Sequence, residues 1–375
     1  MKIVNYIYKF LIILYGLILS INMYSNEGNK DDYPVKFNTS YVFDIVGNTT
    51  GGISTGVTYL GLANISMSLE THTANWWEGG EFYINGANTH GSSPSENLIG
   101  DFQTISNIDG GNHTFLFECW YKHRFKKVTL TLGLQDLNAE FANTENGALF
   151  INSSFGIPSV IPTNIPVSLF PITAIGLSVD WNINDNWNWK NIIYTGEIYD
   201  FDNNKYNIKW NINPKDGILA VSELTFSTNK KYNSCYKIGG YYHNQPENSE
   251  NWNYGFYFIG DQNVWQYSNK KINLFIQTAV NPTKNSTHKY YIGGGINFYG
   301  LLGKRGENCL GLAIAHAGFK GTTFKHETVI EAFYKANFLN HFFIQPDIQY
   351  IISPAGESFN KKNALAIILR GGIEF

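Results

Sequence analysis

The sequence has little charge, few cysteines and, after its first 25 residues, no long apolar run. Charged side chains make up 15% of the 375 residues, and the formal net charge is −3, so the chain has no basic field for nucleic acid. Cys119, Cys235 and Cys309 are widely spaced, which fits neither a disulfide framework nor a zinc site. We therefore expect no nucleic-acid partner, no metal and no cofactor. Helical membrane spans, which need about 20 apolar residues, are also excluded from residue 26 onward.

The first 25 residues have the pattern of an export signal. Lys2 and Lys9 give a positive start, and the apolar run over residues 10–21 is too short for a comfortable membrane span. We expect residues 1–25 to be a cleaved signal peptide and residues 26–375 to form a single domain. The alternative interpretation is a retained N-terminal anchor helix.

Aromatic residues and glycine are abundant, at 16% of the chain and 36 residues respectively. Strand-rich proteins with aromatic girdles have this composition. Apolar and polar side chains alternate in runs of about 10 residues. In the last run, Leu365, Ile367 and Leu369 share one face, while Arg370 and Glu374 lie on the other. This period of two predicts strands that face lipid on one side and water on the other.

The alternating segments and their connections predict sixteen strands. Short polar turns are expected at 75–78, 124–127, 182–186, 228–231, 268–271, 303–307 and 339–341, and longer loops include 90–112, 136–170, 201–217, 244–252 and 354–363. The predicted strands are 40–48, 58–70, 80–89, 113–122, 127–135, 172–181, 188–200, 218–227, 233–243, 253–265, 272–280, 288–299, 308–319, 326–337, 342–353 and 364–375. The fold class is therefore an all-β transmembrane antiparallel β-barrel, wide enough for an aqueous lumen, with both ends on the periplasmic side.

The longest connection, residues 136–170, is a candidate constriction loop. Loops of this length without structure of their own usually have a function. Folded into the lumen, the loop would narrow the pore and allow selection among small solutes. The alternative is a surface loop that shields the rim.

Strand parity gives a set of candidate pore-lining residues. Glu118 and Trp120 alternate with apolar residues such as Phe115 and Phe117, so we expect them to face water. Sugars require hydrogen-bonding groups and aromatic rings. The full set is Glu118, Trp120, Asp136, Asn138, Glu140, Glu331, Gln345, Asp347, Gln349 and Arg370. For each residue, a structural network that holds the shape of the barrel is an equally good interpretation.

Two further features have structural interpretations. Pro346 lies inside a predicted strand, where it would lose a ladder bond, so we expect a bulge or the end of the strand there. Five tryptophans lie near predicted tight turns, where aromatic rings sit at the level of the lipid headgroups. They are Trp76, Trp77, Trp181, Trp187 and Trp189.

Several pieces of sequence match a known family in order. They are residues 100–103, 106–109, 133–141, 149–156, 170–171, 236–242, 261–262, 344–350, 353–354 and 369–370. Together they resemble the OprB family of carbohydrate-selective porins from about residue 40 to the C-terminus. The resemblance implies a sixteen-stranded barrel that passes glucose and other small sugars through an eyelet of charged and aromatic side chains. One departure is that Arg124, Arg305 and Arg370 are the only arginines, whereas well-studied members resemble arginine-rich eyelets.

These observations predict an outer-membrane porin of a Gram-negative cell for passive diffusion of small sugars. No catalytic motif with the right spacing occurs, so we do not expect an enzyme. The alternatives are a general small-solute porin, an outer-membrane barrel enzyme and a soluble secreted β-sandwich or lectin. The expected partners are outer-membrane lipid, sugars in transit and the barrel-assembly machinery, which would read the strand ending in Phe375. The chain would act as a monomer or a homotrimer.

Overall fold

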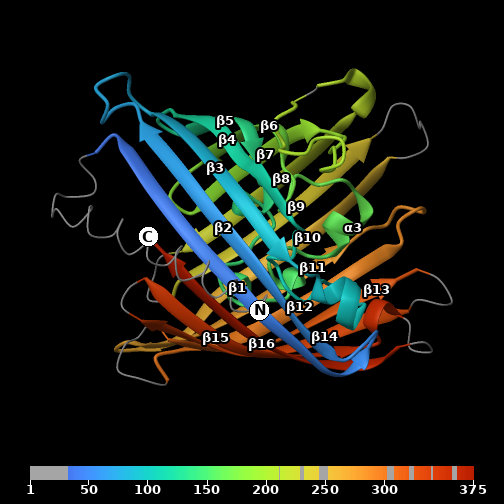
Figure 1. Ribbon diagram of the computed structural model, residues 1–375. Coiled ribbons are helices and arrows are strands. Elements are labelled where there is room, and N and C mark those ends of the chain that lie inside the picture. Colours follow the sequence, from blue (N-terminus) through green and yellow to red (C-terminus); the bar gives the residue numbers. More distant parts are fainter. Residues whose placement is uncertain are drawn as a thin grey trace, which may run out of the picture.

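The computed structural model describes residues 33–210, 212–228, 232–244, 252–301, 308–320, 325–338, 341–356 and 361–375. Within them, sixteen antiparallel strands form a closed barrel in which β1 pairs with β16 (Figure 1). The strands are β1 (Val35–Gly52), β2 (Gly56–Glu70), β3 (Gly80–Gly91), β4 (His113–Arg124), β5 (Val128–Gln135), β6 (Ala174–Asn182), β7 (Trp187–Thr195), β8 (Ile218–Thr228), β9 (Ser234–Asn244), β10 (Asn253–Tyr267), β11 (Lys270–Val280), β12 (His288–Tyr299), β13 (Cys309–Phe319), β14 (His326–Phe338), β15 (Phe342–Ile352) and β16 (Lys362–Glu374).

All sixteen predicted strands are present, and the predicted barrel is confirmed. The largest differences are in β1, which is longer than the predicted 40–48, and in β7, which ends at Thr195 instead of residue 200. The predicted signal peptide and the turn at 303–307, with Arg305, lie outside the described residues, as do parts of the turns at 228–231 and 339–341 and of the loops at 244–252 and 354–363. Arg124 is the last residue of β4.

Alternate side chains along a strand face the lumen and the outside, as the period of two predicts. On β15, Ile344 and Ile348 are exposed on the outer face, whereas Gln345 and Gln349 are buried inside the barrel. On β16, Ile367 is exposed and Ala366 and Ile368 are buried. The outer face is therefore apolar, and the polar residues of these strands lie inside.

A β-bulge at Phe117 interrupts this alternation on β4. Asn85 pairs with Glu118 and Gly86 pairs with Leu116, so Phe117 has no partner on β3. An extra residue in one strand shifts the face of the residues that follow it. The predicted outward orientation of Phe115 and Phe117 is therefore wrong, and both rings contact Phe170 of the loop after β5.

Pro346 does not mark the bulge or strand end that its sequence position predicts. It lies within β15 and pairs with Leu369 of β16. On the other side, the pairs with β14 stop at Phe333–Asp347 and resume at Ala336–Ile344 without a shift of register. A gap in the pairing accommodates the missing N–H of proline, so the strand continues.

The five tryptophans predicted to form a girdle are exposed. Trp76 and Trp77 lie in the connection between β2 and β3, and their rings stack 5.6 Å apart. Trp181 on β6 and Trp189 on β7 have ring centroids 6.2 Å apart. These positions, next to the short connections, are those of an interfacial aromatic girdle.

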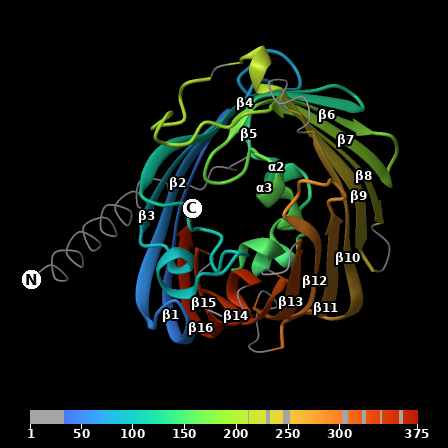
Figure 2. The same cartoon turned by 90° about the vertical axis from the view of Figure 1, so that its right-hand side faces the viewer.

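The connection of residues 136–173, here called the inner loop, folds into the lumen, as predicted. It contains α2 (Leu137–Glu140), η3 (Gly147–Leu149), η4 (Ser153–Phe155) and α3 (Val160–Asn164), and Figure 2 shows α2 and α3 inside the ring of strands. The remaining helices are η2 (Ser95–Ile99), η5 (Pro214–Asp216) and η6 (Pro354–Gly356). No helix in the described part of the chain is long and apolar enough to span a membrane.

The hydrophobic core lies between the inner loop and one side of the barrel wall. The ring of Phe150 lies 4.8 Å from that of Phe333 on β14 and 5.5 Å from that of Phe275 on β11. Phe155, also from the loop, is fully buried beside them. The loop therefore fills this side of the lumen and leaves open space on the opposite side.

Candidate functional site

Carboxylates of the wall fix the inner loop by accepting hydrogen bonds from its backbone. Glu331 on β14 accepts from the N–H groups of Ile151 and Asn152, at 2.6 and 3.1 Å. Gln349 on β15 accepts from the side-chain amide of Asn152 at 3.2 Å. Glu331 and Gln349 are fully buried. They were predicted to line the pore, but the structure covers them with the loop, where they anchor it.

Two more wall carboxylates hold the first half of the loop. Glu223 on β8 accepts from the N–H of Ala142 at 2.8 Å. Asp261 on β10 accepts from Thr144 Oγ1 at 2.6 Å and from Asn146 Nδ2 at 2.7 Å. Hydrogen bonds to charged acceptors are stronger than neutral ones, so the loop is tied to the wall at several points along its length.

Residues 92–112, between β3 and β4, also fold inward. Glu327 on β14 accepts from the N–H groups of Phe102 and Gln103, at 2.7 and 2.9 Å. The N–H of Asn107 donates to the carbonyl of Ile151 at 2.9 Å, which joins this segment to the inner loop. The sequence predicts an extracellular loop at 90–112, whereas the structure folds this segment into the barrel. Residues 92–112 are here called the second inner segment.

Arg370 joins the barrel seam to the second inner segment. Its guanidinium donates to both carboxylate oxygens of Asp44, at 2.7 and 2.8 Å, and to Asn107 Oδ1 at 2.8 Å. Asp44 is completely buried and also accepts from Ser106 Oγ at 2.6 Å. The charge of the predicted pore-lining Arg370 is therefore compensated within the wall.

A central cavity of about 870 Å³ lies between these inner segments and the strands on both sides of the seam. It contains four of the predicted residues, Asp136, Asn138, Gln345 and Arg370. Amides are frequent in its lining, which includes Asn38, Asn64, Asn85 and Asn107. Aromatic rings come from Tyr83, Phe117, Phe170 and Phe343. This lining can donate and accept hydrogen bonds and offers apolar ring faces.

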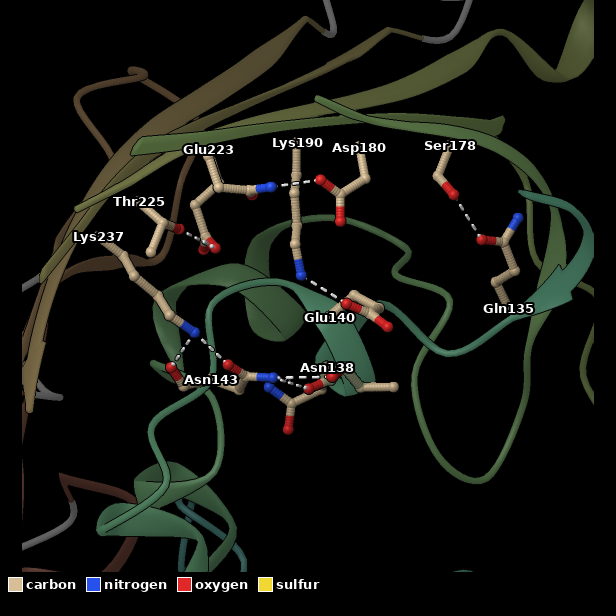
Figure 3. A network of polar contacts seen from close by, with 12 residues as sticks. Gln135, Asn138, Glu140, Asn143, Ser178, Asp180, Lys190, Glu223, Thr225 and Lys237 are labelled. Carbon is tan, nitrogen blue, oxygen red and sulfur yellow. Dashed lines mark hydrogen bonds and ion pairs between the residues drawn. The ribbon is translucent and has the colours of Figure 1, made fainter. Parts of the chain in front are cut away.

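A side cavity of about 330 Å³ lies beneath α2, against β3 to β7, and contains the predicted residues Glu118, Trp120, Asp136 and Glu140. Lys190 Nζ donates to Glu140 Oε2 at 2.5 Å. Figure 3 shows this lysine reaching from the wall to the loop.

The wall of the side cavity also carries aromatic and cationic groups. Trp120 Nε1 donates to Glu118 Oε1 at 3.3 Å, and the ring of Trp120 stacks on that of Tyr83 at 4.8 Å. Lys122 Nζ lies 4.6 Å from the centre of the Trp120 ring. The cavity therefore combines two stacked rings with charges of both signs.

The two acids of the inner loop in this cavity have opposite pKa shifts. Burial, together with the charge of Glu118, raises the pKa of Asp136 to about 7. Burial would also raise the pKa of Glu140, but the ammonium of Lys190 outweighs it and lowers that pKa. Glu140 is therefore ionised at neutral pH, whereas Asp136 is poised to titrate.

This difference predicts a pH-dependent ion selectivity. Because the pKa of Asp136 is raised to about 7, the side chain gains its negative charge between pH 6 and 8. The permeability ratio of K⁺ to Cl⁻ should rise over this range, as measured by the reversal potential in a KCl gradient across a planar bilayer. Asp136→Asn should flatten the rise, and an unchanged pH profile in this variant would contradict the assignment. Glu145→Gln, at an exposed acid of the same loop, is the control.

The structure thus places the ten predicted residues in three groups. Asp136 lies in both cavities, Glu118, Trp120 and Glu140 in the side cavity, and Asn138, Gln345 and Arg370 in the central one. Glu331, Asp347 and Gln349 are buried in the wall. Sequence reasoning missed Tyr83, Phe170, Lys122, Lys190 and the asparagines. Contact of any of these residues with a solute stays a prediction.

Comparisons with solved structures agree on the fold. The high-pH structure of Pseudomonas putida OprB has 18% sequence identity and a TM-score of 0.80, over 92% of this chain and 95% of that chain. The low-pH structure of the same protein has 16% identity and a TM-score of 0.62, over 92% and 93%. A loop L8 deletion mutant of OmpT, an outer membrane protein of Vibrio cholerae, has 9% identity and a TM-score of 0.53, over 91% and 99%.

A search of the curated proteins found no match. The family model described as "Carbohydrate-selective porin, OprB family" matches residues 54–375, which include fifteen of the sixteen strands in full. With the closed barrel and the inner loop described above, this match identifies the chain as a member of the OprB family of carbohydrate-selective porins.

Proposed function

We propose that the protein lets small sugars, glucose among them, diffuse passively through the outer membrane into the periplasm. The observation that supports this proposal most is the composition of the central cavity, in which amides and aromatic rings lie side by side. Neutral sugars present hydroxyl groups and apolar C–H faces, which match these two kinds of side chain.

Two of the cations that line the cavities are paired with acids, which is consistent with a neutral solute. Arg370 is compensated by Asp44, and Lys190 by Glu140. Neither cation is an isolated charge that would concentrate anions in the lumen. These two ion pairs contain only one arginine, so they do not reproduce the arginine-rich eyelet of well-studied members of the family.

Liposome swelling tests the proposed selectivity. Proteoliposomes are diluted into isosmotic glucose or into an amino acid of similar size, and the initial swelling rates are compared. We expect faster swelling in glucose. Equal rates for the two classes would contradict sugar selectivity and would favour the alternative, a general small-solute porin.

Trp120→Ala tests whether the aromatic rings of the side cavity contribute to this selectivity. Aromatic contacts typically contribute about 0.5 to 1.5 kcal/mol, so the ratio of glucose to amino-acid swelling rates should fall by about two- to tenfold. Trp265→Ala, at an exposed ring near the periplasmic end of β10, is the matched control and should keep the ratio. An unchanged ratio in Trp120→Ala would remove this ring from the proposed pathway.

The same proposal includes export, assembly and oligomeric state. Residues 1–25 would direct export and be removed, and the barrel-assembly machinery would recognise the C-terminal strand. Phe375 exchanges backbone hydrogen bonds with Thr39 of β1, at 2.9 and 3.2 Å, so it is part of the seam that assembly must close. The barrel would then act in the outer membrane as a monomer or a homotrimer, without catalytic activity.

A further inference from the structure

Strands β5, β6 and β7 are shorter than β4, so the barrel wall is shorter at this point. The connection after β7 covers the edge that β4 leaves without a partner. β5, β6 and β7 have 8, 9 and 9 residues, whereas β4 has 12. Pairing between β4 and β5 ends at Cys119–Leu134, so β4 extends beyond its neighbour. The connection of residues 196–217, here called the outer loop, lies next to this extension, and Figure 2 shows it in yellow-green beyond the edge of the barrel near β4.

Backbone and side-chain hydrogen bonds fix the outer loop to the extended part of β4. The N–H of Leu116 donates to the carbonyl of Tyr206 at 3.0 Å. Asn207 Nδ2 donates to the carbonyls of Leu116 and Thr173, both at 3.1 Å. Phe201 stacks on His113 with ring centroids 4.0 Å apart. The loop is therefore a fixed part of the wall.

Strand parity shows that the loop packs against the lipid-facing side. Leu132 and Leu177 are about half exposed on the outer faces of β5 and β6. Leu134 has the same parity as Leu132 but is only 1% exposed. It shares a small cavity with Ile198 and Trp210 of the outer loop. Because a residue of outward parity can be buried only by groups outside the wall, the part of the loop around Ile198 and Trp210 lies on the outer surface. Phe201 instead reaches over the edge of the wall, where its ring lies 5.0 Å from that of the inward-facing Phe115.

The outer loop exposes apolar and cationic side chains in alternation. Tyr206, Ile208, Trp210 and Ile212 are between 46% and 72% exposed. Lys205 and Lys209 are exposed between them, with Lys205 Nζ 5.4 Å from the ring of Tyr206 and Lys209 Nζ 3.4 Å from the carbonyl of Asn203. Residues 203–213 contain no acidic side chain.

We propose that Lys205, Tyr206, Ile208, Lys209, Trp210 and Ile212 form a binding surface for a phosphorylated, acylated lipid of the outer leaflet. Acyl chains pack against the exposed apolar residues, and lipid phosphates bind the two ammonium groups. The surface continues the lipid-facing band of Leu132 and Leu177. A two-fold contact with a second copy of the chain is a poorer alternative, because it would bring these lysines close to one another. The inference is independent of which solute passes through the lumen.

Binding of labelled bisphosphorylated, hexa-acylated lipid A to the full-length protein in phosphatidylcholine nanodiscs tests the surface. The double variant Lys205→Glu/Lys209→Glu should bind roughly tenfold more weakly or worse, since each basic residue near an anionic lipid surface adds affinity. Lys284→Glu/Lys320→Glu, at two exposed lysines of other loops on the same side, is the matched control and should bind normally. Folding of each variant is checked by its heat-dependent mobility in detergent gels.

Two further measurements identify which parts of the lipid are bound. Trp210→Ala should also weaken lipid A binding, and inorganic phosphate at the same concentration should not displace the lipid, because it lacks acyl chains. Unchanged lipid A binding in the folded Lys205→Glu/Lys209→Glu and Trp210→Ala variants would overturn the proposal. The proposal would also be overturned if Trp210→Ala abolished a cross-linked oligomer but left lipid A binding unchanged. That result would mean that the surface contacts a second copy of the chain.

Discussion

Replacing residues 143–165 by a short glycine–serine linker should raise the single-channel conductance by about twofold or more, because the segment that narrows the lumen is removed. In the intact protein, Phe150 and Phe155 of this segment pack on Phe275 and Phe333 of the wall. The space that they fill would become part of the water-filled pathway. Discrimination between glucose and an amino acid of similar size should fall together with the rise in conductance.

The measurement is the distribution of conductance steps in a planar bilayer, followed by liposome swelling of the same preparation. Insertion of the linker between Lys126 and Lys127, in the turn between β4 and β5, is the control and should leave both readouts unchanged. A linker variant with normal conductance would mean that the inner loop does not limit the pathway.

The second large effect is expected from Arg370→Ala, which should lower the free energy of unfolding by about 3 to 5 kcal/mol, the usual cost of leaving a buried charge unpaired. Asp44 would stay completely buried and would lose both charge-assisted hydrogen bonds from Arg370. The second inner segment would also lose the bond to Asn107. Urea unfolding of the protein in lipid vesicles, followed by tryptophan fluorescence, measures the effect.

The double variant Asp44→Asn/Arg370→Gln separates the effect of the buried charge on stability from the effect of side-chain packing. It removes both charges and keeps side chains of related shape, so it should recover part of the lost stability. Lys126→Ala, at an exposed lysine of the turn between β4 and β5, should have little effect. If Arg370→Ala were as stable as the unchanged protein, the ion pair would not hold the seam and the second inner segment together.

The strands could be predicted from the sequence because a wall between lipid and water imposes a period of two on local sequence. Residues such as Ile344, Gln345, Ile348 and Gln349 carry that signal without reference to the rest of the chain. The bulge at Phe117 could not be predicted in this way, since the consecutive apolar residues Phe115, Leu116 and Phe117 do not alternate with polar ones. The gap beside Pro346 likewise depends on the pairing with β14.

The inward course of residues 92–112 depends on partners far along the chain. Glu327 lies 225 residues from Phe102, and Arg370 lies 263 residues from Asn107. Parity could place Glu327 and Arg370 inside the barrel, but it carries no information on which loop they bind. For the same reason, Glu331 and Gln349 were correctly placed inside, but parity could not show that the inner loop would bind and cover them.

The central claim is that the chain closes into a water-filled channel that sugars can enter. The most direct measurement is the ion current of the purified, folded protein in a planar bilayer while glucose is added on one side. The account predicts stepwise conductance increments without sugar and a concentration-dependent reduction of the open current with glucose. A folded protein that gives no conductance steps would contradict the account.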